Sequence, residues 1–185
     1  LNLETIGQLF NKKTKLLAIT HASNALGTRN PLSEIIQSAH AHHVPVLVDG
    51  AQSAPHLKID VQALDCDFFT FSSHKTYGPT GVGVLYGKTH LLEAMPPYQG
   101  GGEMILQVNF EKSTYNEIPF KFEAGTPAIA EVIAFGNALE YLERLGWDFI
   151  TKHEKTLLQD ATEKLSAFPG LKIIGTAKEK VGVIS

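Results

Sequence analysis

The feature that most constrains the fold is a strand–helix–strand pattern in the first third of the chain. The run 16–20 is short, apolar and partly β-branched, which predicts a buried strand. Pro31 favours the first position of a helix with Asn30 as its N-cap, and apolar residues within 35–44 recur on one helical face. A second apolar run, 46–48, predicts the next strand. Strands joined in this way are parallel, and the crossover between them is right-handed.

Strands and helices continue to alternate along the rest of the chain. We expect strands at 67–72, 82–86 and 171–174, and helices at 89–95, 129–145 and 147–168. The connection 73–81 is too short for a helical crossover, so the strand after it should run antiparallel. Residues 103–122 carry mixed signals that predict no order of elements. The pattern as a whole predicts an α/β fold with a mainly parallel sheet and flanking helices.

Composition places the chain among globular proteins. It has 185 residues, of which 43% are hydrophobic and 19% charged, so it is long enough to form a core. The net charge of −3 gives no indication of a nucleic-acid or membrane partner. The single cysteine excludes an internal disulfide and favours a reducing compartment, so we expect a cytoplasmic protein.

Polar residues follow the ends of three predicted strands. Ligands of open α/β sheets bind beyond the carboxyl ends of the strands. The residues in question are Asn24 after the first strand, Asp49 and Gln52 after the second, and Ser72, His74 and Lys75 after the third. We expect these side chains to converge on one crevice.

Asp49 follows three apolar strand residues, so we expect its carboxylate to be partly desolvated and to need a partner. Pyridoxal phosphate (PLP) offers one, because an anion beside its ring nitrogen keeps that nitrogen protonated. Gln52 could hydrogen-bond the phenolic oxygen of the same ring. The alternative, an aspartate that caps a strand end in a turn, stays open on this residue alone.

Lys75 has the surroundings that a Schiff-base lysine needs. Such a lysine must lose its proton near neutral pH, which burial and nearby cations favour. Lys75 follows a nearly all-apolar strand and neighbours His74, and both Ser72 and His74 can donate hydrogen bonds to a phosphate. A lone lysine is more often exposed in a loop, but Asp49 on the neighbouring strand favours the cofactor interpretation.

Five motifs together resemble the class V aminotransferase family of PLP enzymes. They are HASNALGT at 21–28, VDGAQ at 48–52, FSSHK at 71–75, YGPTG at 77–81 and FEAGTP at 122–127. Their order and spacing are similar to those of the SufS-type (group II) cysteine desulfurases, and the loop YQGGGEMI at 98–105 supports that subgroup. The resemblance implies a partial fold-type I large domain at 1–180, with 181–185 as the start of a C-terminal small domain.

The resemblance also implies a role for each site residue. Lys75 would form the Schiff base with PLP and move the α-proton of the substrate. Asp49 would pair with the ring nitrogen and Gln52 with the phenolic oxygen, while Asn24 would lie near that oxygen and the substrate carboxylate. The phosphate contacts would come from Ser72 and His74, and from Thr126 of the partner subunit in a homodimer.

The reaction implied is the conversion of L-cysteine, or selenocysteine, to L-alanine. The sulfur would be held as a persulfide and passed to an acceptor protein for iron–sulfur cluster assembly. We expect the nucleophilic cysteine and the carboxylate-binding arginine beyond Ser185, so this piece should not desulfurate cysteine unaided. The alternatives are another class V enzyme (a selenocysteine lyase, a kynureninase-like hydrolase or an aminotransferase) and a non-catalytic module for dimerisation or acceptor binding.

Cys66 and a group of histidines have structural interpretations. Cys66 stands where a strand begins, a position at which a small buried thiol is ordinary, so we do not expect it to be the nucleophile. His40, His42 and His43 stand at a helix end, where histidine favours the negative pole of the helix. No carboxylate or cysteine in the pattern completes a ligand set, so we expect no metal site.

Overall fold

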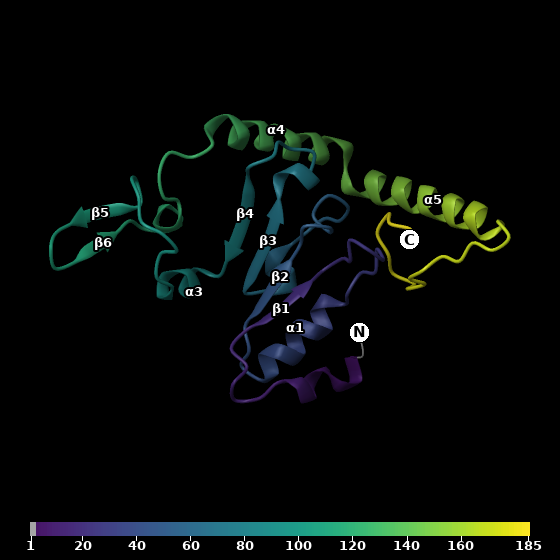
Figure 1. Cartoon of the computed structure of the whole chain (residues 1–185), viewed down its shortest axis with the longest axis horizontal. Helices are drawn as coiled ribbons and strands as arrows, with labels where there is room; N and C mark the ends of the chain where they lie inside the picture. The colour runs from purple at the N-terminus through teal and green to yellow at the C-terminus, as the bar shows by residue number, and fades with distance from the viewer. Residues whose placement is uncertain (1–2) are drawn as a thin grey trace.

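The computed structural model describes residues 3–185 and builds them around a four-stranded sheet with the strand order β1-β2-β3-β4 (Figure 1). The strands are β1 (Leu17–Thr20), β2 (Val46–Asp49), β3 (Phe68–Ser72) and β4 (Gly83–Gly87). The first three are parallel, and β4 runs antiparallel to β3. The predicted α/β fold and the antiparallel fourth strand are therefore confirmed.

The core lies between this sheet and α1 (Leu32–Ala41). Alternate residues of a strand point to opposite faces, so Val46 and Val48 both point toward α1, and both are fully buried. The core cluster consists of Leu32, Ile36, Ala39, Val44, Val46, Val48, Cys66 and Phe69. The buried, structural position predicted for the Cys66 thiol is thus confirmed.

The predicted start of α1 was wrong in one respect. Pro31, not Asn30, is the N-cap residue, and no side chain caps the helix. The Asn30 side chain instead donates a hydrogen bond to the backbone carbonyl of Thr20 at 2.7 Å. The Asn30 side chain therefore binds the end of β1 instead of capping the helix.

Two long helices, α4 (Ile129–Leu145) and α5 (Trp147–Ser166), run in succession along one side of the molecule (Figure 1). Gly146, with φ of 81°, joins them in a conformation that favours glycine. α4 packs on the sheet through Phe135, whose ring centroid lies 5.9 Å from that of Phe71. Within residues 3–185, no helix has both the length and the apolar character needed to cross a membrane.

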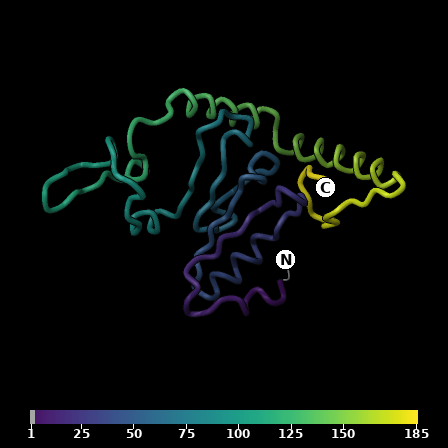
Figure 2. Tube along the Cα trace, viewed as in Figure 1, coloured from purple at the N-terminus to yellow at the C-terminus, as the bar shows by residue number. Residues whose placement is uncertain are grey.

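Residues 103–122, for which the sequence predicted no order of elements, form a hairpin and a short turn. The hairpin strands are β5 (Ile105–Val108) and β6 (Ser113–Tyr115), and they project away from the main sheet (Figures 1 and 2). The short elements elsewhere are η1 (Leu3–Leu9), α2 (Val61–Leu64), η2 (Ser73–Lys75), α3 (Thr89–Ala94) and η3 (Phe120–Phe122).

The strand predicted at 171–174 was wrong, and residues 181–185 also form no strand. A strand needs a continuous neighbour to pair its backbone groups, and these apolar runs have none within the described chain. Ile174 donates its backbone N–H to Ser185, and a single isolated bridge joins Thr28 to Lys180. The C-terminal segment therefore returns beside α5 as irregular chain (Figure 2).

Candidate functional site

The ends of the parallel strands are level with one another at one edge of the sheet. Asp49 at the end of β2 is in register with Thr20 on β1 and with Thr70 on β3. Two backbone hydrogen bonds hold this register at the strand ends. His21 N–H donates to Asp49 O at 2.9 Å, and Gly50 N–H donates to Thr70 O at 2.8 Å. Partners in register point to the same face, so these three side chains share the face opposite α1.

Asp49 presents its carboxylate to the space beyond this edge. Its Oδ1 accepts the backbone N–H of Ala51 at 2.9 Å, which orients the side chain. Its other oxygen has no hydrogen bond or ion pair within residues 3–185. The expected partial desolvation was wrong for the described chain, because the side chain is exposed. The face that carries Asp49 is not covered there, whereas the opposite face packs on α1.

Lys75 follows the end of β3 by three residues. Ser72 lies two residues beyond Thr70 and therefore shares the face of Asp49. The Ser72 hydroxyl lies 2.7 Å from Nδ1 of His74, so the two groups that were predicted to bind a phosphate are already in contact. Lys75 ends the turn η2, and its side chain is exposed rather than buried as expected.

Two buried hydroxyls that the sequence did not single out hold the turn with Lys75. Ser73, with no exposed surface, donates its hydroxyl to Pro79 O at 2.6 Å, and its own carbonyl accepts the N–H groups of Thr76 and Gly78. Thr76, also buried, donates its hydroxyl to Ser72 O at 3.1 Å. The sequence signal that could have identified them is a small hydroxyl residue on each side of the His74-Lys75 pair, since such side chains often bond to the backbone of a turn.

The other predicted residues are divided between two places. Asn24 lies exposed in the turn after β1, and Gln52 is half-buried in the turn after β2, so both belong to the same edge as Asp49. Thr126 lies in the loop before α4. The neighbouring Gly125 donates its N–H to Gly102 O at 2.9 Å, which anchors this loop to the glycine-rich segment rather than to the strand ends.

These groups together fit the chemistry of PLP. The edge offers an anion for a ring nitrogen, an amine for an aldehyde, and a hydroxyl–imidazole pair for a phosphate. The arrangement is open: a cavity of about 580 Å³ lies elsewhere, between α5 and residues 173–182, and none of the predicted site residues lines it. The described chain thus presents, on one open edge of the sheet, groups whose chemistry fits one wall of a PLP site.

The model of the family described as "Aminotransferase class-V" matches residues 1–185. The chain belongs to this family. Class V aminotransferases depend on PLP, so the family agrees with the groups at the strand ends. The resemblance to this family that the five sequence motifs suggested is thereby confirmed.

Among curated relatives, a cysteine desulfurase of Escherichia coli O127:H6 is 52% identical over 186 residues, which cover 100% of this chain and 46% of that protein. The cysteine desulfurase CsdA from Escherichia coli has a similar structure, with a TM-score of 0.92 and 40% identity over 97% of this chain and 45% of the other. The chain is therefore a homologue of cysteine desulfurases and spans about half of their length.

Two further solved structures hold ligands. A variant of C-DES with glycine covalently linked to PLP has a TM-score of 0.89 and 27% identity over 99% of this chain and 49% of the other. SspA in complex with cysteine has a TM-score of 0.63 and 28% identity over 77% and 37%. PLP and cysteine are thus bound by proteins with this fold.

Proposed function

We propose that this chain is the central PLP-binding part of a SufS-type cysteine desulfurase. The whole enzyme would convert L-cysteine to L-alanine and retain the sulfur as a persulfide for an acceptor protein. The similarity to two cysteine desulfurases supports the reaction. The glycine-rich loop 98–105 supports the SufS subgroup.

The observation that carries the proposal is the register of β2 on β3. It places the carboxylate of Asp49 and the turn that bears Lys75 at the same edge of the sheet, on adjacent strands. Adjacent strands are about 4.8 Å apart, so an aromatic ring of ordinary size can lie across both ends. An acid and an amine on opposite sides of one ring are what PLP chemistry needs.

Each residue then has a defined task. When bound, PLP supplies an electron sink for a carbanion at the α-carbon of an amino acid. The amine of Lys75 would hold the cofactor covalently and later move the α-proton of the substrate. The carboxylate of Asp49 would pair with the protonated ring nitrogen. Ser72 and His74 would bind the phosphate and Gln52 the phenolic oxygen, while Asn24 would lie near that oxygen and the substrate carboxylate.

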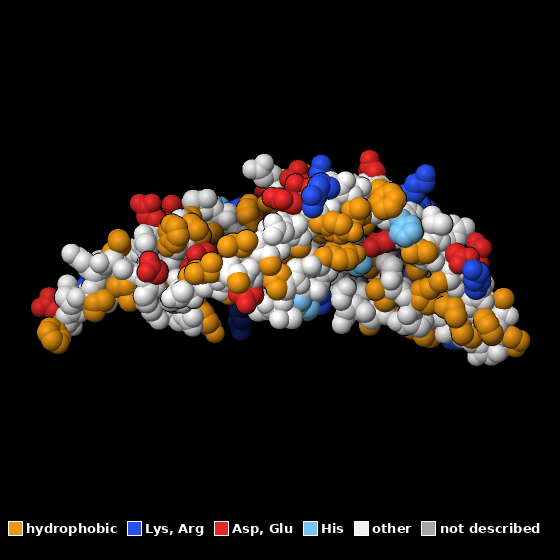
Figure 3. Space-filling view, turned by 90° about the horizontal axis from the view of Figure 1, so that it is seen from above, with side chains coloured by type: hydrophobic (Ala, Val, Ile, Leu, Met, Phe, Trp, Pro, Cys, Tyr) orange, Lys and Arg blue, Asp and Glu red, His pale blue; other side chains and the backbone are white. Residues whose placement is uncertain are grey.

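The proposal includes a homodimer whose second subunit completes the site. A compact monomer of 20.2 kDa exposes about 8,800 Å² of surface. This chain exposes 12422 Å², and large apolar side chains such as Phe110 on the hairpin and Ile133 on α4 are among the exposed ones. Figure 3, which views the molecule from the side on which α4 and α5 lie, shows hydrophobic side chains along its whole length. Such a surface favours burial against more protein.

The finer parts of the proposal follow from the same resemblance. Residues 1–180 would belong to the large domain, and 181–185 would begin the small domain. The acceptor protein would carry sulfur to iron–sulfur cluster assembly in the cytoplasm. Thr126 would contact the cofactor phosphate of the partner subunit. The exposure of its side chain supports this, as does the bond that holds the neighbouring Gly125 to the glycine-rich segment.

The test uses the full-length protein that contains this chain. The protein is incubated with PLP and reduced with borohydride, and the modified peptide is identified by mass spectrometry. We expect the adduct on Lys75, and we expect L-cysteine to yield alanine and sulfide in equal amounts with a thiol reductant. Alanine formed from selenocysteine alone would indicate a selenocysteine lyase. A protein that takes up no PLP would contradict the cofactor assignment altogether.

A further inference from the structure

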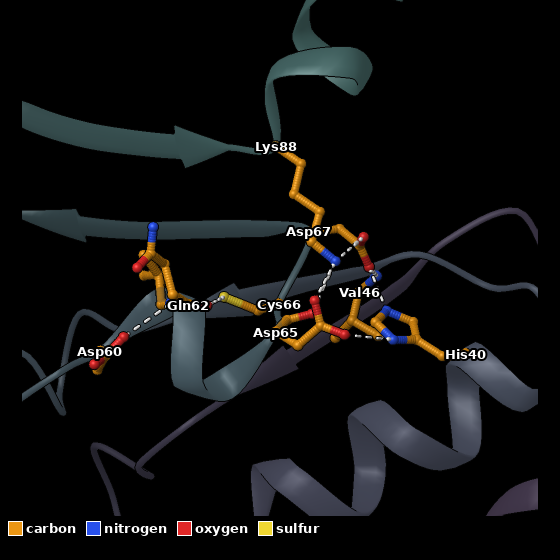
Figure 4. A network of polar contacts seen from close by, with 9 residues as sticks. His40, Val46, Asp60, Gln62, Asp65, Cys66, Asp67 and Lys88 are labelled. Atoms are coloured by element: carbon orange, nitrogen blue, oxygen red, sulfur yellow. Dashed lines mark hydrogen bonds and ion pairs between the residues drawn. The ribbon is translucent and has the colours of Figure 1, made fainter.

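A polar network lies at the opposite edge of the sheet from the proposed cofactor site. It joins Asp67 and Asp65, which precede β3, to His40 at the end of α1 and to Lys88, which follows β4 (Figure 4). Val46, the first residue of β2, enters the network through its backbone N–H. One cluster of side chains therefore contacts the ends of four elements that build the sheet and its cover.

Asp67 is the centre of this network. Its Oδ2 accepts the backbone N–H of Val46 at 2.7 Å and lies 2.8 Å from Nε2 of His40, while its Oδ1 lies 3.1 Å from Nζ of Lys88. Only 9% of its side chain is exposed, against 66% for Asp65, so the contacts of Asp67 are screened far less by solvent. Burial raises the pKa of the Asp67 carboxyl, but the hydrogen bonds from His40, Val46 and Lys88 outweigh burial and hold it below its usual value.

The backbone of Asp67 is bonded on both sides as well. Its N–H donates to Val46 O at 3.1 Å, and its carbonyl accepts the N–H of Lys88 at 3.0 Å. Two hydrogen bonds therefore join the starts of β2 and β3: Asp67 N–H donates to Val46 O, and Val46 N–H donates to the Asp67 carboxylate. The pair stands directly before the first register pair of these strands, Leu47 with Phe68.

The register of β2 on β3 rests on few contacts. The two strands share only three register pairs, from Leu47–Phe68 to Asp49–Thr70. A slip of one residue would turn every side chain of a strand to the other face. Such a slip would point the Asp49 side chain into the core, so that it would no longer share a face of the sheet with Ser72. The buried hydrogen bond from the Val46 N–H to the Asp67 side chain lies next to the first pair. It opposes the slip, because a slip would leave both groups buried without a partner.

We infer that Asp67 is a positioning residue for the cofactor site. Through its bond to the Val46 N–H, the Asp67 carboxylate holds β2 in register on β3 and so places Asp49 on the same edge and face as the turn that carries Lys75. The inference rests on the proposed function for its consequence at the cofactor. Its structural part, the clamp between two strands, does not require a cofactor.

Three substitutions in the full-length protein separate the contributions of the network. Asp67→Ala removes both the bond to Val46 and the ion pairs. Asp67→Asn keeps an amide oxygen that accepts the Val46 N–H but removes the charge. Asp65→Asn is the matched control, because Asp65 contacts the same His40 and Lys88 without any bond to Val46.

Two measurements distinguish positioning from general stabilisation. The first is hydrogen exchange of peptides covering 46–50 and 68–76, measured without PLP. The second is the dissociation constant of PLP, checked by borohydride trapping on Lys75, well below the unfolding temperature of each variant. We expect faster exchange and an affinity about tenfold or more weaker for Asp67→Ala. Asp67→Asn and Asp65→Asn should lower the unfolding temperature but exchange slowly in both segments and bind PLP like the wild type.

The inference is overturned if folded Asp67→Ala keeps the wild-type exchange and affinity, or if Asp65→Asn weakens PLP binding as much as Asp67→Ala. Should Asp67→Ala fail to fold, Asp67→Asn decides: a folded variant that loses PLP contradicts the inference, and one that keeps PLP supports it. If the wild type takes up no PLP while Asp67→Ala alone exchanges faster, the clamp stands and the proposed function fails.

Discussion

Asp49 lies in register with Thr70 across two parallel strands, and the next residue along the chain, Gly50, donates its N–H to Thr70 O at 2.8 Å. This relationship turns two distant sequence motifs into neighbours. It brings an acid in the VDGAQ motif and an amine in the FSSHK motif to the same edge of the sheet, as the proposed PLP site requires.

Replacing Lys75 with alanine should abolish covalent attachment of PLP while the fold survives. The side chain is exposed and ends a turn that is held by Ser73 and Thr76, so its loss removes no core contact. Intact mass after borohydride reduction measures the adduct, and circular dichroism measures the fold. Lys58→Ala, at another exposed lysine, is the control and should keep the adduct. An adduct that persists in Lys75→Ala would assign the attachment to a different lysine.

Replacing Asp49 with asparagine should weaken PLP binding without abolishing it. It should also reduce the rate of exchange of the substrate α-proton about a hundredfold or more. The amide oxygen can still accept the Ala51 N–H, so the turn keeps its geometry while the negative charge is lost. Proton NMR of L-alanine in deuterated water measures the exchange in the full-length protein. Exchange at the wild-type rate would show that the ring nitrogen has no need of this carboxylate.

Gly50→Ala should destabilise the protein by about 1–3 kcal/mol and weaken PLP binding. A Cβ at this position would lie 2.1 Å from Cζ of Phe69, whose buried ring has no room to retreat. The free energy of unfolding from urea titration measures the effect. Gly136→Ala is the matched control: it lies in α4 with open space around it, and helix propensity should stabilise it by up to about 1 kcal/mol. Equal effects of the two substitutions would refute the packing argument.

His21 should make stability depend on pH in the acid range. Burial, with a smaller contribution from the charge of Arg29, lowers the pKa of His21 from 6.5 to about 4. Between these values the unfolded chain binds a proton that the folded chain does not, so stability is full above pH 6.5 and falls as the pH drops toward 4. Thermal unfolding across this range measures the slope.

The variant His21→Leu isolates this effect. The Nδ1 atom of His21 is buried without a hydrogen-bond partner in the described chain, so an apolar side chain of similar size loses no bond there. We expect a flatter dependence of the unfolding temperature on pH. His90→Gln, at an exposed histidine, should keep the wild-type slope. The same slope in His21→Leu would assign the acid sensitivity to other groups.

Most of the sheet could be predicted from local pattern. The apolar runs that became β1, β2 and β3 lie within a residue or two of the observed strands, and the short 73–81 connection correctly predicted the antiparallel β4. Helices α4 and α5 were also predicted, because each shows apolar periodicity and both are bounded by Gly146. These are properties of the chain over one turn or one strand at a time.

Pairing could not be predicted in the same way. The run 171–174 has the apolar character of a strand, yet no described strand lies beside it, and it stays irregular. Residues 103–122 form a hairpin whose register shifts between Ile105 and Gln107, which weakened the alternation that would have signalled it. Backbone hydrogen bonds need a partner that local sequence does not name.

The sequence by itself determined the order of the main strands and of the long helices, and the family to which the chain belongs, since acid, amine and hydroxyl groups each follow a strand at a recognisable spacing. Only the tertiary structure decided that Asp49 and Ser72 share a face, that both Asp49 and Lys75 are open to solvent in this chain, and that Asp67 bonds Val46 at the far edge of the sheet. The physical reason is that composition and periodicity act along the chain, whereas exposure and register depend on what packs beside it.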